Sequence, residues 1–285
     1  MALFNRIVSL TIGTAGNVGQ AVNFYSDKDQ NAPHITFNIV KTNSQEPNTA
    51  MVDVYNSEKT IDSVLPKASE VTKQVLILHA GYEQDVGLQL MYVGTITNLE
   101  KHPQKPDSTV KFTANDGYEA LTTKRFGKSY EKKASAKQLM KDCTDAMGAP
   151  VTGMDPKEII DQILDGGFTA SGPASNTMDT VTKKLKLRWS FQNGNIKIVP
   201  YSITNSEIVT AYFISEFTGM IGAPEMITDP DYGDGYRVKS LLLPQVEPDD
   251  VIQLDKYGSF RVHKVTHSGG TYIADFTSEL LVFSK

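Results

Sequence analysis

Three glycines follow the first predicted strand directly, a placement that in nucleotide-binding proteins brings backbone groups close to phosphate. Gly13, Gly16 and Gly19 come after the apolar segment 7–12, with the spacing G-x-x-G-x-x-G. The dinucleotide motif is G-x-G-x-x-G, the P-loop adds a lysine, and both need a helix N-terminus that points at the phosphate. Residues 21–25 predict another strand, so a glycine-rich hairpin is favoured over a nucleotide site.

Two of the five histidines, His263 and His267, are four residues apart. On a helix this spacing would suit a metal ion. The surrounding pattern predicts a strand, in which four residues span about 13 Å, so one ion would reach both only across a sharp bend. We favour a hydrogen bond from His267 at a strand end and predict no metal ligand.

The acidic segment 229–235 (DPDYGDG) resembles part of a calcium-binding loop. An EF-hand loop needs oxygen ligands at positions 1, 3 and 5 and a glutamate at position 12. Counted from Asp229, the fifth position is Gly233 and the twelfth is Ser240, so the requirement fails. An acidic, glycine-rich turn is predicted instead, and no cofactor is predicted for the chain.

The single cysteine, Cys143, lies beside Asp142 and close to Asp145. Carboxylates raise the pKa of a thiol, whereas a nucleophile needs a lowered pKa. Cys143 also falls on the apolar face of a predicted helix, which favours a core position. No G-x-S-x-G motif is present. Paired carboxylates for glycoside cleavage stay open, but no pattern marks a pair. We therefore predict no catalytic residue and no enzyme activity.

Two groups of basic residues are candidates for contact with an acidic neighbour. The larger group is Lys124, Arg125, Lys128, Lys132, Lys133, Lys137 and Lys141. The smaller group, Lys184, Lys186 and Arg188, alternates with the apolar residues Leu185, Leu187 and Trp189. Each group is either a solvated surface or a docking patch.

The composition is that of an ordinary soluble globular protein, with 40% hydrophobic and 21% charged residues in a chain of 285. The net charge of −5 argues against a general nucleic-acid binder, which would be basic overall. One cysteine excludes an internal disulfide framework. No secretory signal is recognisable, and no apolar run approaches the roughly 20 residues that span a bilayer.

The patterns predict a mainly β (α+β) protein with two small antiparallel β-barrel-like domains joined by a short helical connector. Residues 1–120 alternate between apolar and polar side chains and predict six or seven short strands without a clear helix. Residues 186–285 predict strands again, beginning with a hairpin at Asn193-Gly194. Closing such strands into barrels avoids exposed sheet edges.

The connector, residues 121–185, predicts three short helices. Ser135 and Gln138 form a capping box before the first helix, which Gly148 ends. The second begins at 155–158 (DPKE), and its apolar face is Ile159, Ile160, Ile163 and Leu164. The third covers residues 178–185.

The segment 217–267 carries a motif order that points to a family. It contains a tight apolar turn (TGMIGAP), an apolar run before a proline (VKSLLLP), an acidic turn and a closing strand (GSFRVHKVTHSG). Earlier in the chain stand ITFNIVKT with PNTAMVDVYN, and YVGTITNLE with TVKFTANDGYEAL. Together these resemble the tail hub (baseplate hub) proteins of long-tailed, chiefly contractile-tailed, bacteriophages, over most of the chain.

The resemblance implies a structural protein of the virion tail baseplate, made in the host cytoplasm. Hubs of this family form a homotrimeric ring, and two similar barrels per subunit then supply six quasi-equivalent positions for the sixfold tail tube. The opposite side of the ring presents threefold symmetry to the central spike, and a channel for DNA runs along the axis. A closed ring of this kind needs a head-to-tail interface that closes after a fixed number of copies.

The partners implied by the resemblance are a central spike protein, a tail tube or distal tube-initiator protein, other baseplate proteins and the tape measure protein. DNA would pass without specific binding, and no membrane insertion is expected. No spike or lysozyme-like domain is recognisable in the sequence, so a separate spike protein is implied. Three alternatives stay open: a hub or spike-base protein of a tailocin or type VI system, a hub-borne cell-wall hydrolase, and a carbohydrate-binding barrel, which a single tryptophan makes less favourable.

Overall fold

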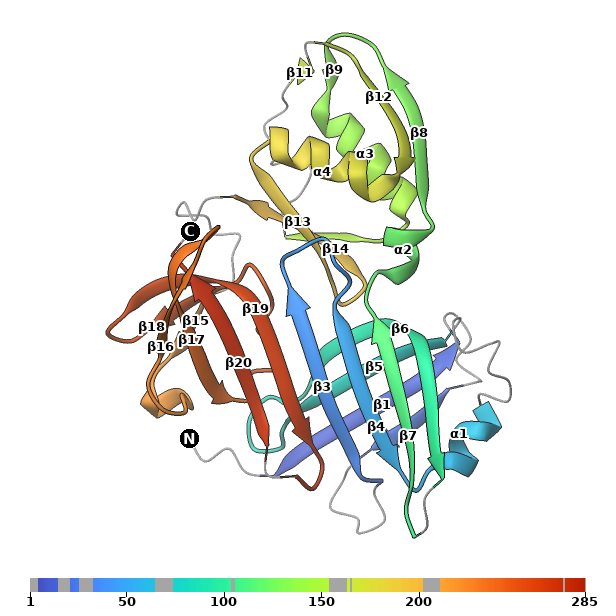
Figure 1. Cartoon of the computed structure of the whole chain (residues 1–285), viewed down its shortest axis with the longest axis vertical. Helices are drawn as coiled ribbons and strands as arrows, with labels where there is room; N and C mark the ends of the chain where they lie inside the picture. The colour runs from blue at the N-terminus through green and yellow to red at the C-terminus, as the bar shows by residue number, and fades with distance from the viewer. Residues whose placement is uncertain are drawn as a thin grey trace.

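A computed structural model of the chain describes residues 5–14, 21–25, 33–64, 74–103, 106–153, 163–164, 166–201, 211–273 and 275–284. Strands dominate these residues, and helices are few and short (Figure 1). The mainly β, α+β class predicted from the alternating patterns is therefore confirmed.

The N-terminal β region is built from seven strands and one short helix. Its elements are β1 (Arg6–Thr14), β2 (Val22–Tyr25), β3 (Ile35–Thr42), β4 (Thr49–Tyr55), α1 (Glu58–Val64), β5 (Gln74–Tyr82), β6 (Gly87–Pro103) and β7 (Ser108–Asn115). Burial alternates strictly along β3, since every second side chain enters the core. The pairing order β3-β4-β7-β6-β5-β1-β2 is antiparallel throughout.

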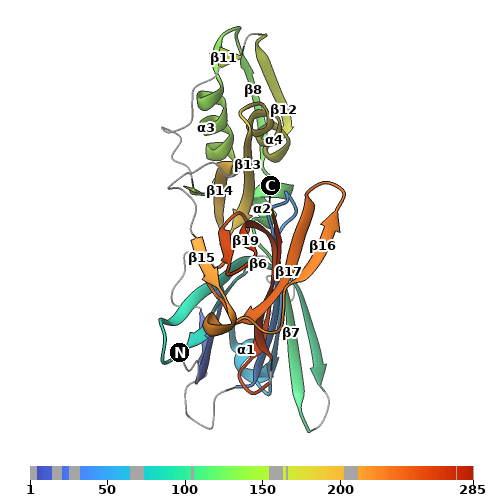
Figure 2. The ribbon, with the colours of Figure 1, turned by 90° about the vertical axis from the view of Figure 1, so that its left-hand side faces the viewer.

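This sheet folds back on itself to form two layers. In Figure 1, β1, β5 and β6 cross behind β3, β4 and β7, and Figure 2 shows the two layers from the side. The long strand β6 joins the layers, and its register with β7 shifts between Ile96 and Asn98. Such a bulge bends a strand and increases its twist, which is what a sheet that turns back on itself requires.

Among its described residues, the middle region contains two of the three helices that the sequence predicts, α3 and α4. Its elements are α2 (Tyr118–Thr122), β8 (Arg125–Tyr130), β9 (Ala134–Ser135), α3 (Ala136–Met147), β10 (Val151–Gly153), β11 (Ile163–Leu164), β12 (Phe168–Pro173), α4 (Ala174–Lys184), β13 (Leu187–Gln192) and β14 (Asn195–Pro200). It stands at one end of the long axis in both ribbon views (Figures 1 and 2). Ser135 caps α3 by accepting a hydrogen bond from the Gln138 N–H, and Gly148 ends it at φ 72°, as predicted.

The C-terminal β region continues the N-terminal sheet. Its elements are β15 (Ala211–Ile214), the 3₁₀ turn η3 (Glu216–Thr218), β16 (Glu225–Asp229), β17 (Gly233–Leu241), β18 (Val251–Leu254), β19 (Gly258–Gly270) and β20 (Phe276–Phe283). The first part of β19 pairs with β18, and after a bulge between Val262 and Lys264 the second part pairs with β3. The two β regions are thus hydrogen-bonded into one 13-stranded sheet, rather than forming two separate closed sheets.

Three hydrophobic clusters fill the described parts of the molecule. The first lies inside the N-terminal region and also receives Leu242 and Phe276 from the C-terminal region. The third lies between β15, β17, β18, β19 and β20. The second joins the helices to Leu187, Trp189 and Ile198, which the sequence analysis assigned to the C-terminal part. The predicted domain boundaries at residues 120 and 185 stay a prediction. The β13–β14 hairpin, which follows the second boundary, packs on the helices of the middle region.

Several local predictions need correction. Ile163 and Leu164 do not belong to a helix, because they form β11 and pair with Ser135 and Ala134. The start of that predicted helix, residues 155–158, lies outside the described residues. Helices α1 and α2 were missed, since each covers less than two full turns and leaves little periodicity to detect. Helix α4 begins at Ala174, before the predicted residue 178.

Other local predictions are confirmed. The Asn193-Gly194 hairpin joins β13 to β14, with φ values of 54° and 81° at the two turn residues. β2 is a strand antiparallel to β1 and not a helix that could face a phosphate. Among the described helices the longest, α3, has 12 residues, and none combines the length and apolar character needed to cross a bilayer.

Candidate functional site

The three regions meet at a junction of polar side chains, where the buried charged groups of the described residues lie. Lys197 of β14 shows the arrangement best. Its Nζ atom lies 2.8 Å from Asp250 Oδ1 and 3.2 Å from Glu247 Oε2, and it donates to the Pro248 carbonyl at 3.0 Å. Burial alone would lower the pKa of Lys197, but the two carboxylates outweigh it and raise the pKa. Lys197 therefore stays charged and ties the middle region to the acidic turn of the C-terminal region.

A second lysine enters the same junction from the N-terminal region. Lys41 lies on the apolar face of β3, fully buried, and its Nζ donates to Asn193 Oδ1 at 3.1 Å. Asn193 in turn donates to Glu247 Oε1 at 2.7 Å. Asp116 accepts the backbone N–H of Gly194 at 2.9 Å, and burial raises the pKa of its carboxyl to about 6. The hairpin tip is thus held from both β regions at once.

Two arginines complete the junction around Asp249. Arg261, 2% exposed, donates from Nη1 to the Pro200 carbonyl at 2.7 Å, and the same atom lies 3.7 Å from Asp249 Oδ1. Arg188 Nη1 lies 4.0 Å from that oxygen, and Asn43 Nδ2 donates to it at 3.2 Å. A buried carboxylate needs such partners, because leaving one uncompensated costs several kcal/mol. The network therefore fixes how the three regions are oriented.

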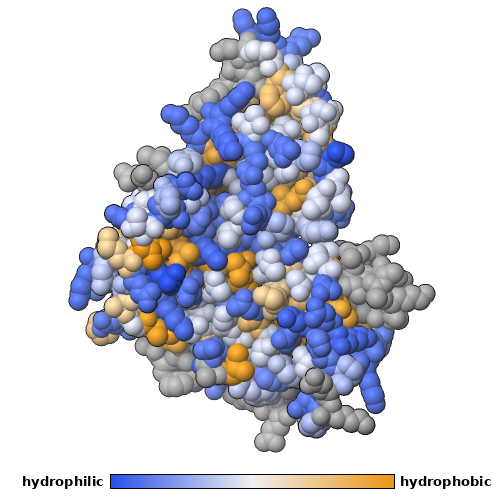
Figure 3. Space-filling model, viewed as in Figure 1, coloured by the Kyte–Doolittle hydropathy of each residue, from blue (hydrophilic) through white to orange (hydrophobic). Residues whose placement is uncertain are grey.

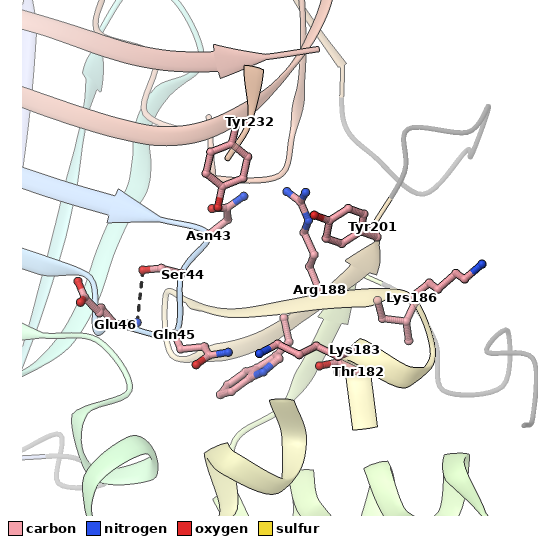
Figure 4. A pocket seen from close by; sticks show the side chains of 12 residues that line it. Asn43, Ser44, Gln45, Glu46, Thr182, Lys183, Lys186, Arg188, Tyr201 and Tyr232 are labelled. Atoms are coloured by element: carbon pink, nitrogen blue, oxygen red, sulfur yellow. Dashed lines mark hydrogen bonds between the residues drawn. The ribbon is translucent and has the colours of Figure 1, made fainter. Parts of the chain in front are cut away.

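A pocket of about 870 Å³ opens beside this junction and is shown in Figure 4. One wall is the β3–β4 loop, and the other is the end of α4 with the start of β13. The lining residues are Asn43, Ser44, Gln45, Glu46, Thr182, Lys183, Lys186, Leu187, Arg188, Trp189, Tyr201 and Tyr232. We call it the junction pocket. Its volume falls within the range of about 300–1,000 Å³ that is typical of ligand sites.

A second hollow, of about 480 Å³, lies between the β5–β6 turn and the segment around η3. Its lining is largely apolar and includes Leu241, Leu242 and Pro244. Two side chains that line it project into solvent, Phe217 at 91% exposed and Val86 at 67% exposed. We call this the apolar groove. On the face shown in Figure 3, orange side chains also gather over the C-terminal strands, whereas those of the middle region are mostly blue or white. Exposed apolar side chains around a groove mark a contact surface.

Cys143 lies in the core, as predicted. It is buried on α3, and its Sγ donates to the Ala174 carbonyl at 3.2 Å. Burial, with smaller contributions from Asp142 and Asp179, raises the pKa of the thiol to about 12. Asp142 instead binds Lys128 and Tyr130 across to β8. A thiol in this state is not a nucleophile.

The two histidines lie in β19 but in different surroundings. His267 is fully buried inside the strand rather than at its end, and its Nδ1 lies 2.8 Å from Ser278 Oγ. His263 lies at the bulge and contacts the Tyr232 ring, with centroids 4.1 Å apart. Within the part of the chain that the structure describes, no three His, Cys, Asp or Glu residues are grouped as a metal site would need.

The acidic segment 229–235 forms the tight turn between β16 and β17. Asp229 Oδ1 accepts the backbone N–H groups of Asp231 at 2.8 Å and Tyr232 at 3.1 Å. The carboxylate thus supports the turn itself, which is a common role of aspartate at such positions. Of the three glycines that suggested a phosphate loop, Gly13 lies within β1, and Gly16 and Gly19 lie outside the described residues.

The larger basic group covers β8, the following turn and α3. Lys128 pairs with Asp142 at 2.5 Å and Lys124 pairs with Glu119 at 3.1 Å. In the smaller group, Lys186 and Arg188 line the junction pocket but Lys184 does not. Lys183, which was not among the predicted basic residues, lines the pocket one position before Lys184 on the last turn of α4. Its place directly before Lys184, in the same run of basic residues, was the signal that could have found it.

No protein-family model matches the sequence, and no curated protein is significantly similar to it in sequence. Solved structures are similar in fold. A tail protein from Neisseria meningitidis MC58 matches with a TM-score of 0.64 and 8% identity, over 97% of this chain and 96% of that chain. The 43 kDa tail protein of prophage MuSo2 from Shewanella oneidensis matches with a TM-score of 0.60 and 8% identity, over 96% of both chains.

The E. coli c3393 protein is a component of the type VI secretion system that is itself structurally similar to the T4 tail proteins gp27 and gp5. It matches with a TM-score of 0.60 and 11% identity, over 90% of this chain and 75% of that chain. At such identities the likeness concerns the fold alone. This chain has the fold of phage tail proteins, and that fold includes all three regions because the matches extend over nearly its whole length.

Proposed function

We propose that this protein is a structural baseplate hub of a bacteriophage tail, and that three copies form a ring between the sixfold tail tube and the threefold central spike. The observation that carries the proposal is the full-length likeness in fold to two phage tail proteins. A catalytic arrangement among the described residues does not compete with it, since the charged groups are concentrated at a junction where they bind one another.

The sheet topology supports a ring subunit. The N-terminal and C-terminal β regions each surround a hydrophobic cluster of their own, and β3 and β19 join them edge to edge. Three such subunits would place six β regions around an axis, as a sixfold partner requires. Among the described strands, β2 and β16 stand at the two ends of the main pairing order, where a neighbouring subunit could add a strand.

Rigidity is the second property needed by a ring that joins a sixfold tail tube to a threefold spike. The junction binds the three regions through buried charges, so that force on the spike side is transmitted to the tube side without a hinge. The partners in this proposal are the spike protein, the tube or tube-initiator protein, other baseplate proteins and the tape measure protein. DNA would pass along the axis unbound, and few basic side chains should therefore face the channel.

The mass of the purified protein in solution tests the ring directly. We expect a species of three times the 31.3 kDa chain mass, at micromolar protein concentrations or after addition of the spike protein. A protein that remains a monomer under both conditions, or that forms only dimers, would contradict the proposal.

A second candidate is the equivalent component of a type VI secretion system or another contractile injection machine. It is favoured by the E. coli type VI neighbour, whose TM-score of 0.60 equals that of the prophage protein. Neighbouring genes distinguish the two, since capsid genes indicate a phage and their absence beside sheath and effector genes indicates an injection machine.

A further inference from the structure

The junction pocket has the chemistry of a peptide-binding site. Two walls face each other across it in Figure 4: polar side chains of the β3–β4 loop on one side, and basic and aromatic side chains of α4, β13 and Tyr201 on the other. We propose that the junction pocket binds an acidic, aromatic-containing segment of a partner protein. That the partner belongs to the same assembly rests on the proposed function, whereas the chemistry of the pocket does not.

Charge is the first argument. The lining includes three cations, Lys183, Lys186 and Arg188, and one carboxylate, Glu46. Arg188 already faces Asp249 across 4.0 Å. Both lysines are exposed. The Asp179 carboxylate interacts electrostatically with Lys183, whereas no ion pair of Lys186 is found among the described residues. The positive charge at the mouth therefore comes mainly from Lys186, with Lys183 partly offset by Asp179, and a segment with carboxylates would be attracted to it.

The apolar wall is the second argument. Leu187 and Trp189 are held in the core of the middle region, and the Trp189 Nε1 atom donates to Asp179 Oδ1 at 2.6 Å. The Tyr201 ring lies against the Arg188 guanidinium at 4.0 Å from its centroid. These side chains are therefore fixed before any ligand arrives, and a rigid apolar wall accepts an aromatic or aliphatic side chain at low entropic cost.

The polar wall suits a peptide backbone. Asn43, Ser44 and Gln45 present amide and hydroxyl groups, which can both donate and accept hydrogen bonds, as peptide N–H and C=O groups require. Asn43 is fixed by its bond to Asp249, and Ser44 accepts the Glu46 N–H at 3.4 Å. The loop is thus tied to the junction and to its own turn.

The end of α4 distinguishes a carboxylate from a phosphate. Phosphate sites in proteins use helix N-termini and glycine backbones, where N–H groups converge. The junction pocket instead borders the carbonyl end of α4, and its lining contains no glycine. The negative end of the helix dipole opposes the double charge of a phosphate more strongly than the single charge of a carboxylate.

The backbone of Lys186 adds an independent observation. Its φ angle is 54°, in the left-handed region that glycine usually occupies after a helix. A lysine is disfavoured in this region relative to glycine, because its Cβ atom crowds the following carbonyl oxygen. The side chain that is kept at this cost lines the mouth of the pocket.

The chain offers its own reporter for a test. Trp189 is the only tryptophan and it lines the pocket, so its fluorescence responds to occupancy. We would titrate the full-length protein with the peptide Glu-Glu-Phe-Glu-Glu, with Lys-Lys-Phe-Lys-Lys and with inorganic phosphate. We expect a saturable emission change with the acidic peptide alone, half-complete at or below about 1 mM and weaker at higher salt.

Two charge reversals make the test specific. Lys186→Glu should weaken the acidic peptide at least about tenfold, whereas Lys184→Glu, with the same charge change on an exposed residue outside the pocket, should leave its affinity within about twofold. Circular dichroism checks whether Lys186→Glu folds. If it does not, Lys183→Gln serves as the pocket variant and should weaken binding of the acidic peptide several-fold.

Other results overturn the inference. No response to the acidic peptide, an equal response to the basic peptide, or equal loss in Lys184→Glu would remove the pocket as an acidic-segment site. Competition by phosphate at equal concentration would make it a small-anion site. Loss of self-association in Lys186→Glu would make the occupant a second copy of this chain. These readings do not depend on ring formation, since the titration works on a monomer as well as on a trimer.

Discussion

Among single residues, His267 makes the clearest prediction about pH. Burial lowers the pKa of His267 to about 3, with Lys41 contributing, whereas histidine in an unfolded chain has a pKa of about 6.5. The unfolded chain therefore takes up the proton first, so the stability that this group contributes is present above pH 6.5 and is lost as the pH falls toward 3. At pH 5 the loss amounts to about 2 kcal/mol.

Replacement of His267 by asparagine removes this titration. The decrease in the free energy of unfolding between pH 7 and pH 5, measured by urea denaturation, should be about 2 kcal/mol smaller in His267→Asn than in the unaltered protein. The exposed His102, replaced in the same way, serves as the matched control. An unchanged pH dependence in His267→Asn would show that the ring accepts a proton inside the fold.

Lys197 carries the prediction about the junction. Lys197→Met leaves Asp250 and Glu247 without their cation in a site that is mostly buried, so the free energy of unfolding should fall by about 3 kcal/mol or more. The control is Arg237→Met, which breaks solvent-exposed pairs with Glu225 and Glu279 and should cost about 1 kcal/mol or less. Equal effects of the two substitutions would mean that the junction does not stabilise the fold.

At the scale of elements, the closeness of β17 to β20 depends on Gly235. A Cβ atom at this position would lie 2.2 Å from the Val282 carbonyl oxygen, which is backbone and cannot move aside cheaply. We expect Gly235→Ala to reduce the free energy of unfolding by at least about 2 kcal/mol. Gly127→Ala is the control, because this strand glycine in β8 has no atom within 4 Å of an added Cβ. Its effect should stay within about 0.5 kcal/mol. Chemical denaturation of both variants measures the difference.

The elements also show which features of the fold can be predicted from sequence patterns. Alternation over residues 35–39 predicts β3, and the capping residues predict α3, because both signals are local. The pairing of β3 with β19 joins residues more than 200 positions apart, so no local pattern contains it. The β13–β14 hairpin was predicted correctly as a hairpin, but which core it enters depends on helices α3 and α4 packing against it.

The candidate site was predicted only in fragments for the same reason. Lys186 and Arg188 were predicted as part of a group of basic residues. The loop that faces them, Asn43 to Glu46, belongs to a distant part of the sequence. Lys41 lies in β3, where the three preceding residues on its face are apolar, and nothing local indicates that its amino group meets Asn193 in the interior. A polar side chain on a buried strand face is the signal that could be used in similar chains.

For the whole molecule, the apolar groove makes a prediction about assembly. Phe217 is 91% exposed at its edge, and burying such a side chain against a neighbour contributes about 2 kcal/mol. We expect Phe217→Ser to weaken the association of subunits, or of subunit and tail partner, about tenfold or more without lowering the melting temperature. Sedimentation at several protein concentrations measures this.

The control for Phe217 is another exposed aromatic residue that lies outside the groove. Tyr118 on α2 is 40% exposed and does not line that hollow. Tyr118→Ser should leave association unchanged. Equal association in both variants would mean that the apolar groove faces solvent in the assembled state.

The proposed ring connects these scales. Its building unit would be one sheet that continues through both β regions and is rigidly joined to the middle region. Electron cryomicroscopy of the intact tail or injection particle that contains this protein tests that account most directly. It predicts three copies of the chain in one closed ring at the junction of tube and spike, with the N-terminal and C-terminal β regions alternating around the axis. Six copies in the tube wall, or single copies at the periphery of the baseplate, would contradict it.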